Sequence, residues 1–248
     1  NATLDRKALT DWAFKMAMAE YKKGMPIAEY EAFKKAVGTF MQKMNDLDEI
    51  PLVEYTRDFE DITYTENEKT MLVNYLSAGY QSLLWMLMEI SFRIALLNPE
   101  MSDYSQAEGI VLIDEIDMHL HPRWQWKILD ALHSSFPKVQ FIVSSHAPAV
   151  INSVPREQIR ILDHGEIYMP AAQTYGRDAN SILREVMNVS ERPADIKQRM
   201  DLFYAYMDEN NYKEADMILT EIEAIVGTTD PDIAAARTSL DLERILGE

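Results

Sequence analysis

The stretch from Gly109 to Pro122 constrains the fold more than any other part of the chain, and it reads Gly-Ile-Val-Leu-Ile-Asp-Glu-Ile-Asp-Met-His-Leu-His-Pro. Its apolar run, Ile110 to Ile113, is typical of a short strand buried on both faces of a parallel sheet. Two adjacent carboxylates, Asp114 and Glu115, end this run. Burying neighbouring acids is costly unless a cation or a reaction uses them. The acid pair is therefore the first candidate for a functional site.

Two further motifs flank the acid pair at compatible distances. Upstream, Leu76-Ser-Ala-Gly-Tyr-Gln-Ser82 precedes an apolar helical pattern that continues to Leu97. A serine-glycine turn at a helix N-terminus is an anion site, because backbone N–H groups point at the ligand. Downstream, Phe141-Ile-Val-Ser-Ser-His-Ala-Pro148 predicts a second buried strand that ends in polar residues. A histidine just past a parallel strand lies at the crevice where such sheets bind ligands.

The segment between the two strands predicts their relative direction. A helix is expected from about residue 122 to 134, between strands at 110–113 and 139–144. Such a strand-helix-strand unit makes the two strands parallel, with a right-handed crossover. The fold class expected from the sequence is therefore α/β.

The order of turn and helix, acidic strand and histidine strand resembles the ABC-class ATPases, which are P-loop nucleotide hydrolases. Within that class, the motifs resemble the RecF- and OLD-related bacterial group called "predicted ATP-binding proteins involved in virulence". That group includes AAA-type ATPases of the Septu type and of some retron anti-phage systems. The resemblance covers roughly residues 70–190 and is weaker toward the C-terminus. It implies the C-terminal lobe of an ATPase head. The residue patterns add a small antiparallel patch ahead of the signature turn and a C-terminal helical bundle.

The resemblance implies roles in ATP hydrolysis for residues at the two strand ends. Asp114 matches the carboxylate that holds Mg²⁺ through its water shell, and Glu115 matches the base that orients and deprotonates the attacking water. His146 matches the switch histidine that contacts the γ-phosphate, although a satisfied core histidine is the alternative. Asp117 falls where relatives carry the loop that links the two sites of a dimer. ATP and Mg²⁺ are the cofactors that follow.

The signature turn is implied in the same way. Ser77 and Gly79 match the Leu-Ser-Gly-Gly motif, with Ala78 in place of one glycine and Tyr80 in place of the usual glutamine. In ABC-class enzymes this turn reaches the nucleotide held by the other subunit, and a helix N-terminus supplies about half a positive charge for that contact.

The phosphate-cradling loop of this class, Gly-x-x-x-x-Gly-Lys-Ser/Thr, is missing from the sequence. None of the eight glycines is followed by lysine. We therefore expect the chain to be the C-terminal part of a longer protein, and we expect this part alone to be inactive. The alternative is a native chain that has lost the loop.

Composition limits the partners and the compartment. The formal net charge is −17, which argues against this fragment itself gripping nucleic acid by neutralising phosphates. There are no cysteines, so no disulfide framework is expected. No apolar run reaches the roughly 18 residues that span a membrane, and no signal peptide is evident. A cytoplasmic protein that does not bind membranes is the expectation.

The pattern of apolar residues predicts a helical segment at 1–49 and a helical appendage at 191–248, and the resemblance implies that the region between them, 50–190, is the ATPase lobe. The predicted helices outside the central unit are 3–23, 28–43, 178–188, 193–209, 212–226 and 231–246. Short β-type runs are expected at 52–55, 62–65 and 70–73, and a hairpin at 158–162 and 166–169.

Taken together, the motifs predict an Mg²⁺-dependent ATPase that works as a head-to-tail homodimer. From the resemblance, its cycle gates a partner nuclease in anti-phage defence, and nucleic acid is contacted by the partner or by a lobe outside this fragment. One alternative is an interaction module that only dimerises. Another is a metal-dependent nuclease that uses Asp114, Glu115, Asp117, His119 and His121, since His-x-His near acids can bind a transition metal.

Overall fold

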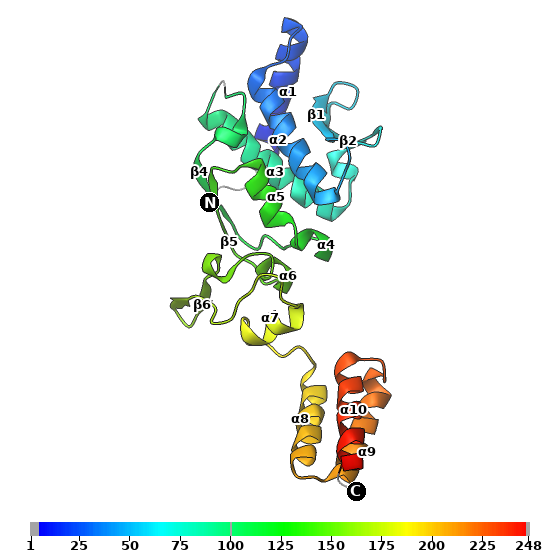
Figure 1. The fold of residues 1–248 in the computed structure, drawn as a ribbon. Helices are drawn as coiled ribbons and strands as arrows, with labels where there is room; N and C mark the ends of the chain where they lie inside the picture. Colours follow the sequence, from blue (N-terminus) through cyan, green and yellow to red (C-terminus); the bar gives the residue numbers. More distant parts are fainter. Residues whose placement is uncertain (1–4, 100, 247–248) are drawn as a thin grey trace. The chain divides into compact units, whose positions relative to one another are not determined.

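A computed structural model describes residues 5–99 and 101–246, shown as a ribbon in Figure 1. The chain divides into two compact units, Asn1–Ala179 and Asn180–Glu248. The expected 1–49 segment belongs to the first unit, where its helices share a core with the strands that follow. The second unit begins at Asn180 and therefore includes one more short helix than the expected 191–248 appendage.

Two helices open the first unit, α1 (Arg6–Lys23) and α2 (Ala28–Asn45). The Asp5 side chain caps α1 by accepting a hydrogen bond from the Ala8 N–H at 3.0 Å. Gly24 ends α1 in the left-handed conformation, at φ 64°, a conformation that glycine adopts without a steric penalty. Residues 3 and 4, where the predicted first helix begins, lie outside the described residues.

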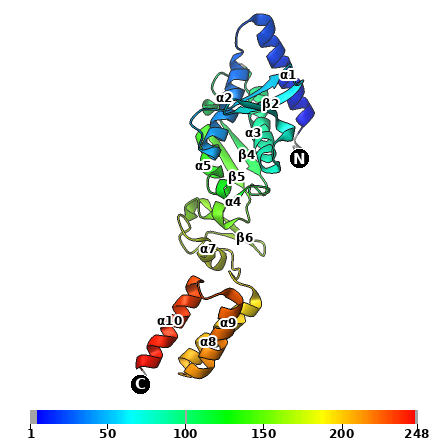
Figure 2. The ribbon, with the colours of Figure 1, turned by 90° about the vertical axis from the view of Figure 1, so that its right-hand side faces the viewer.

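The expected antiparallel patch is confirmed as a sheet of three strands, β1 (Leu52–Thr56), β2 (Asp61–Glu66) and β3 (Lys69–Leu72), in the order β1-β2-β3. The β2–β3 turn places Asn67 and Glu68 at positive φ. Strand β1 contacts both α1 and α2, so the sheet is joined to the helical core (Figure 2). A short 3-10 turn, Val73–Tyr75, leads from β3 to the next helix.

The central unit confirms the α/β fold class. Helix α3 (Ala78–Leu97) is followed by β4 (Gly109–Ile113), and β4 pairs in parallel with β5 (Val139–Val143). The single helix predicted between the strands is two, α4 (Pro122–Gln125) and α5 (Ile128–Ser135). After β5 come α6 (Pro148–Ile151) and the expected hairpin, β6 (Ile161–Asp163) and β7 (Glu166–Tyr168).

The core of the first unit lies among α1, α2, α3 and α5, and one face of the β4–β5 pair packs against it. Fully buried side chains from these helices include Leu9, Phe33, Met41, Leu84 and Leu132. From the strands, Val111, Ile113, Phe141 and Val143 pack against the same cluster.

The prediction that the acidic strand is buried on both faces is wrong in this structure. The exposed fraction is 63% for Ile110, 75% for Leu112 and 51% for Ile142. Within the described residues, β4 pairs with β5 alone, and the core covers only the face that carries Val111 and Ile113. Alternate side chains of a strand point to opposite faces, so every second apolar residue remains uncovered.

The second unit is helical, as predicted, with α7 (Ala179–Glu185), α8 (Ala194–Asp208), α9 (Tyr212–Val226) and α10 (Pro231–Leu246). Helix α9 packs against both α8 and α10. The small core consists of buried residues at helical spacing, which include Phe203, Leu219, Ile222, Ile233 and Leu240.

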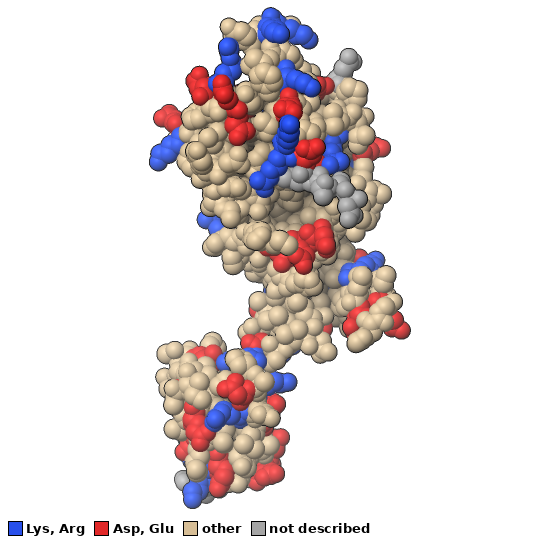
Figure 3. Space-filling model, turned by 180° about the vertical axis from the view of Figure 1, so that it is seen from behind, with Lys and Arg blue, Asp and Glu red and all other residues tan. Residues whose placement is uncertain are grey.

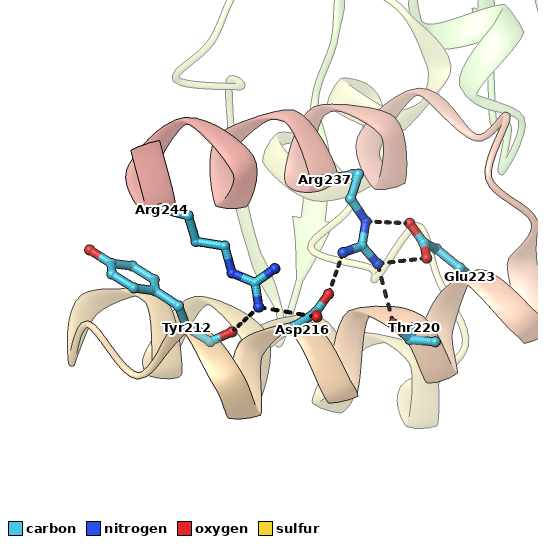
Figure 4. Close-up of polar contacts among 6 residues, drawn as sticks. All are labelled: Tyr212, Asp216, Thr220, Glu223, Arg237 and Arg244. Carbon is cyan, nitrogen blue, oxygen red and sulfur yellow. Dashed lines mark hydrogen bonds and ion pairs between the residues drawn. The ribbon is translucent and has the colours of Figure 1, made fainter. Parts of the chain in front are cut away.

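An arginine network joins α9 to α10 beside that core (Figure 4). The Arg237 guanidinium donates to both Glu223 oxygens, at 2.8 and 2.7 Å, and also contacts Asp216. Arg244 donates to the other Asp216 oxygen at 3.1 Å. The Arg237 hydrogen bonds lower the pKa of the Asp216 and Glu223 carboxyls from their usual range.

Across residues 5–99 and 101–246, none of the helices is both long enough and apolar enough to cross a membrane. On the face drawn in Figure 3, Lys and Arg side chains are mixed with Asp and Glu side chains. Together with the net charge of −17, this surface offers little attraction for a polyanion.

Candidate functional site

The two strand ends meet because β4 and β5 are parallel and in register. Ile113 lies opposite Val143, so the residues that follow, Asp114 and Ser144, are also neighbours. The Ser144 N–H donates to the Ile113 carbonyl at 3.0 Å, and the Ile116 N–H donates to the Ser144 carbonyl at 3.0 Å. These two hydrogen bonds continue the β4–β5 ladder past the strands. They hold the residues from Asp114 to Ile116, which we call the acidic turn, against the end of β5.

The Ser144 hydroxyl contacts both members of the acid pair. It donates to Asp114 Oδ1 and accepts a hydrogen bond from the Glu115 N–H at 2.8 Å. Glu115 itself has φ 49°, in the left-handed region. That conformation costs about 1–2 kcal/mol for a residue with a side chain, and such strain often marks functional sites. Both acids are exposed, so their carboxylates are accessible to a ligand.

Asp117 and His146 are brought to the same edge. The His146 N–H donates to Asp117 Oδ1 at 3.2 Å, which ties the segment after β5 to the loop after β4. The His146 side chain is exposed, so the core-histidine alternative does not describe it. Four predicted site residues, Asp114, Glu115, Asp117 and His146, therefore lie in one contiguous cluster.

Ser77 occupies the N-cap position of α3 and is exposed. Its side chain makes no capping hydrogen bond to the helix. Instead, Gln81 holds the turn, with its Nε2 donating to the Asn74 carbonyl at 2.9 Å and the Leu76 carbonyl at 2.8 Å. The first N–H groups of a helix lack partners within it, and the dipole favours anions there. This end of α3 is therefore suited to a phosphate group.

Gly79 places the turn against the loop that follows the acid pair. A Cβ atom at this position would lie 2.9 Å from Cζ3 of Trp124 and 3.1 Å from the carbonyl oxygen of His119. The next residue, Tyr80, packs edge-on against Trp124 with ring centroids 5.1 Å apart. Burial raises the pKa of Tyr80, and the nearby Glu66 raises it further, so its phenol is neutral at physiological pH.

Helix α4 is anchored to the C-terminal end of α2. Trp124 Nε1 donates to Asn45 Oδ1 at 3.2 Å, and Arg123 donates to Asp46 Oδ2 at 2.7 Å. Lys127 forms a further ion pair with Asp46. Hydrogen bonds from Lys127 and then Arg123 lower the pKa of the Asp46 carboxyl. The turn at Gly79, which lies against Trp124, and the loop that follows the acid pair are thus both held against the C-terminal end of α2.

The two histidines of the His-x-His pattern do not form a metal cluster. His119 is exposed at φ 64°, and His121 caps α4 by accepting a hydrogen bond from the Arg123 N–H at 3.2 Å. Among residues 5–99 and 101–246, no three His, Cys, Asp or Glu side chains are grouped so that they could hold a metal ion. The nuclease alternative gains no support from this arrangement.

The acid pair instead fits Mg²⁺, which proteins usually bind through one or two carboxylates together with substrate phosphates and water. Asp114 and Glu115 offer exposed oxygen donors of this kind. Asp114 uses one oxygen to accept the Ser144 hydroxyl, and within residues 5–99 and 101–246 its other oxygen accepts no hydrogen bond.

Two residues of the site were not predicted from the sequence. The sequence marks Ser144 only as one of the polar residues that end the second predicted strand, and it assigns Trp124 no role in the site. The parallel strand-helix-strand unit was the available signal for Ser144, because it brings the residues that follow both strands together. No sequence signal pointed to the contact of Trp124 with Gly79, which joins helices far apart in the chain.

The chain is similar in sequence to a known protein family. The family model described as "AAA domain, putative AbiEii toxin, Type IV TA system" matches residues 19–152, which is more than half of the chain. The matched region contains the signature turn, the acid pair and His146.

Curated bacterial proteins are also similar to this chain. The chain is 33% identical over 171 residues to "Retron Vc95 probable ATPase" of Vibrio cholerae serotype O1 biovar El Tor, covering 67% of this chain and 32% of that protein. It is 30% identical over 147 residues to "Septu protein PtuA" of Bacillus mycoides (strain KBAB4), covering 59% of this chain and 19% of that protein. The chain thus spans about a third or less of the length of these relatives.

Among solved structures, the SMC head domain from Thermotoga maritima is 14% identical and superimposes with a TM-score of 0.39, covering 56% of this chain and 47% of that chain. A structure described by "ATP-driven dimerization and DNA stimulated activation of SMC ATPases" is 16% identical with a TM-score of 0.41, covering 63% of this chain and 92% of that chain.

Proposed function

Because the chain belongs to the family described as "AAA domain, putative AbiEii toxin, Type IV TA system", we propose that it supplies one part of an Mg²⁺-dependent ATPase site. The observation that carries this proposal is the acid pair at the end of β4, joined through Ser144 to the segment that carries His146. The "probable ATPase" relative supports the same activity.

In this proposal each residue of the cluster has a separate task. Asp114 would hold Mg²⁺, which when bound neutralises charge on the β- and γ-phosphates. The Glu115 carboxylate accepts a proton from the water that attacks the γ-phosphate. The exposed imidazole of His146, two residues beyond Ser144, would contact the γ-phosphate. Positioning and charge stabilisation account for most of the rate enhancement in such reactions.

The phosphate loop has to come from another segment, since none of the eight glycines of these 248 residues is followed by the lysine of that loop. We use "complete ATPase" for these residues together with the segment that supplies the loop. We further propose that the N-terminal end of α3, at Ser77 and Gly79, receives the γ-phosphate of ATP held by a second subunit. The active form would then be a head-to-tail dimer.

The biological role that we propose is control of a partner nuclease in anti-phage defence, in keeping with the retron and Septu relatives. The negative charge of the chain supports a protein partner more than direct contact with nucleic acid. Co-purification of the complete ATPase with a nuclease encoded beside it, and loss of phage protection on mutation of either, would test this role.

The central test replaces Glu115 with Gln in the complete ATPase. The amide keeps the size of the side chain but cannot act as the base, so ATP turnover should fall by about 10²–10⁴ while ATP binding persists. Glu108→Gln is the matched control, because Glu108 is an exposed acid that precedes β4 and lies outside the cluster. Near-normal turnover of Glu115→Gln in a steady-state assay would refute the assignment of the base.

A mixing experiment tests the head-to-tail dimer. Ser77→Arg places a bulky cation in the turn and should abolish turnover without affecting ATP binding by the same subunit. When it is mixed with inactive Glu115→Gln subunits, a cross-subunit arrangement creates one doubly damaged site and one intact site. Activity should therefore reappear on mixing. If Ser77 and Glu115 served the same site within one subunit, each site would carry a lesion and mixing would restore nothing.

A further inference from the structure

Ser144 links the two strand ends through four hydrogen bonds. Its N–H donates to the Ile113 carbonyl and its carbonyl accepts from the Ile116 N–H, each at 3.0 Å. Its hydroxyl accepts from the Glu115 N–H at 2.8 Å and donates to Asp114 Oδ1. Ser144, which directly follows β5, thus contacts four consecutive residues, from Ile113 at the end of β4 to Ile116.

The direction of the hydroxyl proton is determined by these contacts. A serine hydroxyl has one proton to donate and two lone pairs that accept. The Glu115 N–H can only donate, so the serine proton is available for the Asp114 carboxylate. Hydrogen bonds of this charged type are shorter and stronger than neutral ones. Ser144 therefore occupies Oδ1 of Asp114 and not its other oxygen.

The same hydroxyl holds the backbone from which the Glu115 side chain projects. Glu115 is in the left-handed conformation, at φ 49°, which a residue with a Cβ adopts only when its surroundings compensate. The hydrogen bond from its N–H to Ser144 is one such compensation. Because Ser144 itself is exposed, its hydroxyl contributes little to the buried core, so its contacts act on the orientation of the two acids.

We propose that Ser144 is a positioning residue that sets the Asp114 and Glu115 carboxylates relative to each other for hydrolysis. This inference rests on the ATPase function proposed above. Ser144 touches neither the attacking water nor the phosphate, and acts through the two acids. Displacement of reacting groups by about 1 Å can lower a rate by about a hundredfold, which sets the scale of the effect.

The adjacent serine provides a matched control. Ser145 Oγ accepts a hydrogen bond from the Ala147 N–H at 3.1 Å and makes no hydrogen bond to Asp114 or Glu115. Ser145→Ala removes the same hydroxyl from the same segment and leaves the bridge intact. Ser144→Thr is the conservative variant, because threonine retains a hydroxyl and suits the end of a strand.

The experiment measures two quantities on Ser144→Ala, Ser144→Thr and Ser145→Ala. In the complete ATPase, Ser144→Ala should lower kcat by about 10- to 100-fold and leave KM within about twofold, because substrate binding does not use the hydroxyl. In the 248-residue chain without nucleotide, hydrogen exchange of the Glu115 amide should become about fivefold faster, as expected for loss of one hydrogen bond. Ser144→Thr and Ser145→Ala should stay near wild type in both.

Three outcomes would overturn the proposal: a near-normal kcat in Ser144→Ala, an equal loss in Ser145→Ala, or a loss in Ser144→Thr as deep as in Ser144→Ala. Should Ser144→Ala fail to fold, Ser144→Cys decides, because a thiol of similar size is a weak donor and should lower kcat in the same direction. The two proposals fail separately. Absence of ATP turnover in the wild-type complete ATPase contradicts the proposed function, and full turnover in Glu115→Gln contradicts the assignment of Glu115 as the base. An inactive Glu115→Gln beside a fully active Ser144→Ala contradicts only the role of Ser144.

Discussion

Replacing Gly79 with alanine should damage the site although the added methyl group touches no catalytic residue. The new Cβ would lie 2.9 Å from Cζ3 of Trp124 and 3.1 Å from the carbonyl oxygen of His119. Carbon atoms in ordinary contact are about 3.5–4.0 Å apart, so the indole or the turn has to move by roughly 0.6–1 Å. The indole is held by Asn45 and by the ring of Tyr80, so the movement is resisted.

Two energies of opposite sign decide the effect on stability. Alanine is favoured over glycine in a helix by about 1 kcal/mol. Forcing a methyl group into a packed contact typically costs about 1–3 kcal/mol. The neighbours here are an anchored ring and a backbone carbonyl. We therefore expect the close contact to outweigh the gain in helix propensity and to lower the free energy of unfolding by about 1 kcal/mol. For a domain of this size, that difference lowers the melting temperature by about 2–4 °C.

The effect on activity should be larger, because the same movement separates the signature turn from the acidic loop. A shift approaching 1 Å predicts a loss in kcat of about 10- to 100-fold in the complete ATPase. Melting of the 248-residue chain, followed by tryptophan fluorescence, measures the stability change, and steady-state turnover measures the activity change.

Gly109→Ala is the control for this experiment, since a Cβ at Gly109 meets nothing within 4 Å. Trp124→Leu combined with Gly79→Ala should recover part of the lost stability by removing the obstructing ring. A Gly79→Ala protein as stable as Gly109→Ala, with normal turnover, would show that Gly79 does not lie in close contact with Trp124 and His119.

Further predictions concern nucleotide binding and the helical unit. The 248-residue chain alone should show no measurable affinity for ATP–Mg²⁺ by calorimetry, because the sequence lacks the lysine loop; micromolar binding would contradict this. Arg237→Ala, which loses the two-oxygen contact with Glu223, should destabilise α9–α10 by about 1–3 kcal/mol by local hydrogen exchange. Arg199→Ala, which breaks one exposed pair with Glu221, should cost at most about 0.5 kcal/mol. The hydrogen bond from Arg192 lowers the pKa of Asp230 in the folded state, as those from Arg237 do for Asp216 and Glu223. The stabilisation of the folded state by these carboxylates should therefore be complete above about pH 5 and be lost as the pH falls through the lowered pKa values. The difference in melting temperature between pH 7 and pH 3 should be smaller in Arg237→Ala than in the wild type. Deleting 193–248 from the complete ATPase should leave basal ATP turnover in place and weaken partner binding. A folded deletion variant that binds ATP without hydrolysing it would show that the helical unit is needed for hydrolysis.

The elements that sequence predicted best are those whose signals are local. The end of α1 follows from Gly24, and the start of α8–α10 from helical spacing and turn residues. The parallel β4–β5 pair follows from the crossover rule, which needs only the order of elements. The break between α4 and α5 was not predicted, because the sequence around Trp126 and Lys127 carries neither glycine nor proline.

By itself, the sequence determined which chemistry is present: an acid pair after an apolar strand, a histidine after the next strand and a serine-glycine turn before a long helix. These features depend on residues adjacent in the chain. Only the tertiary structure decided that Ser144 bridges the two acids, that Gly79 rests on Trp124 and that one face of β4 is uncovered. Each of these depends on what lies across from a residue in space, and periodicity along the chain does not carry that information.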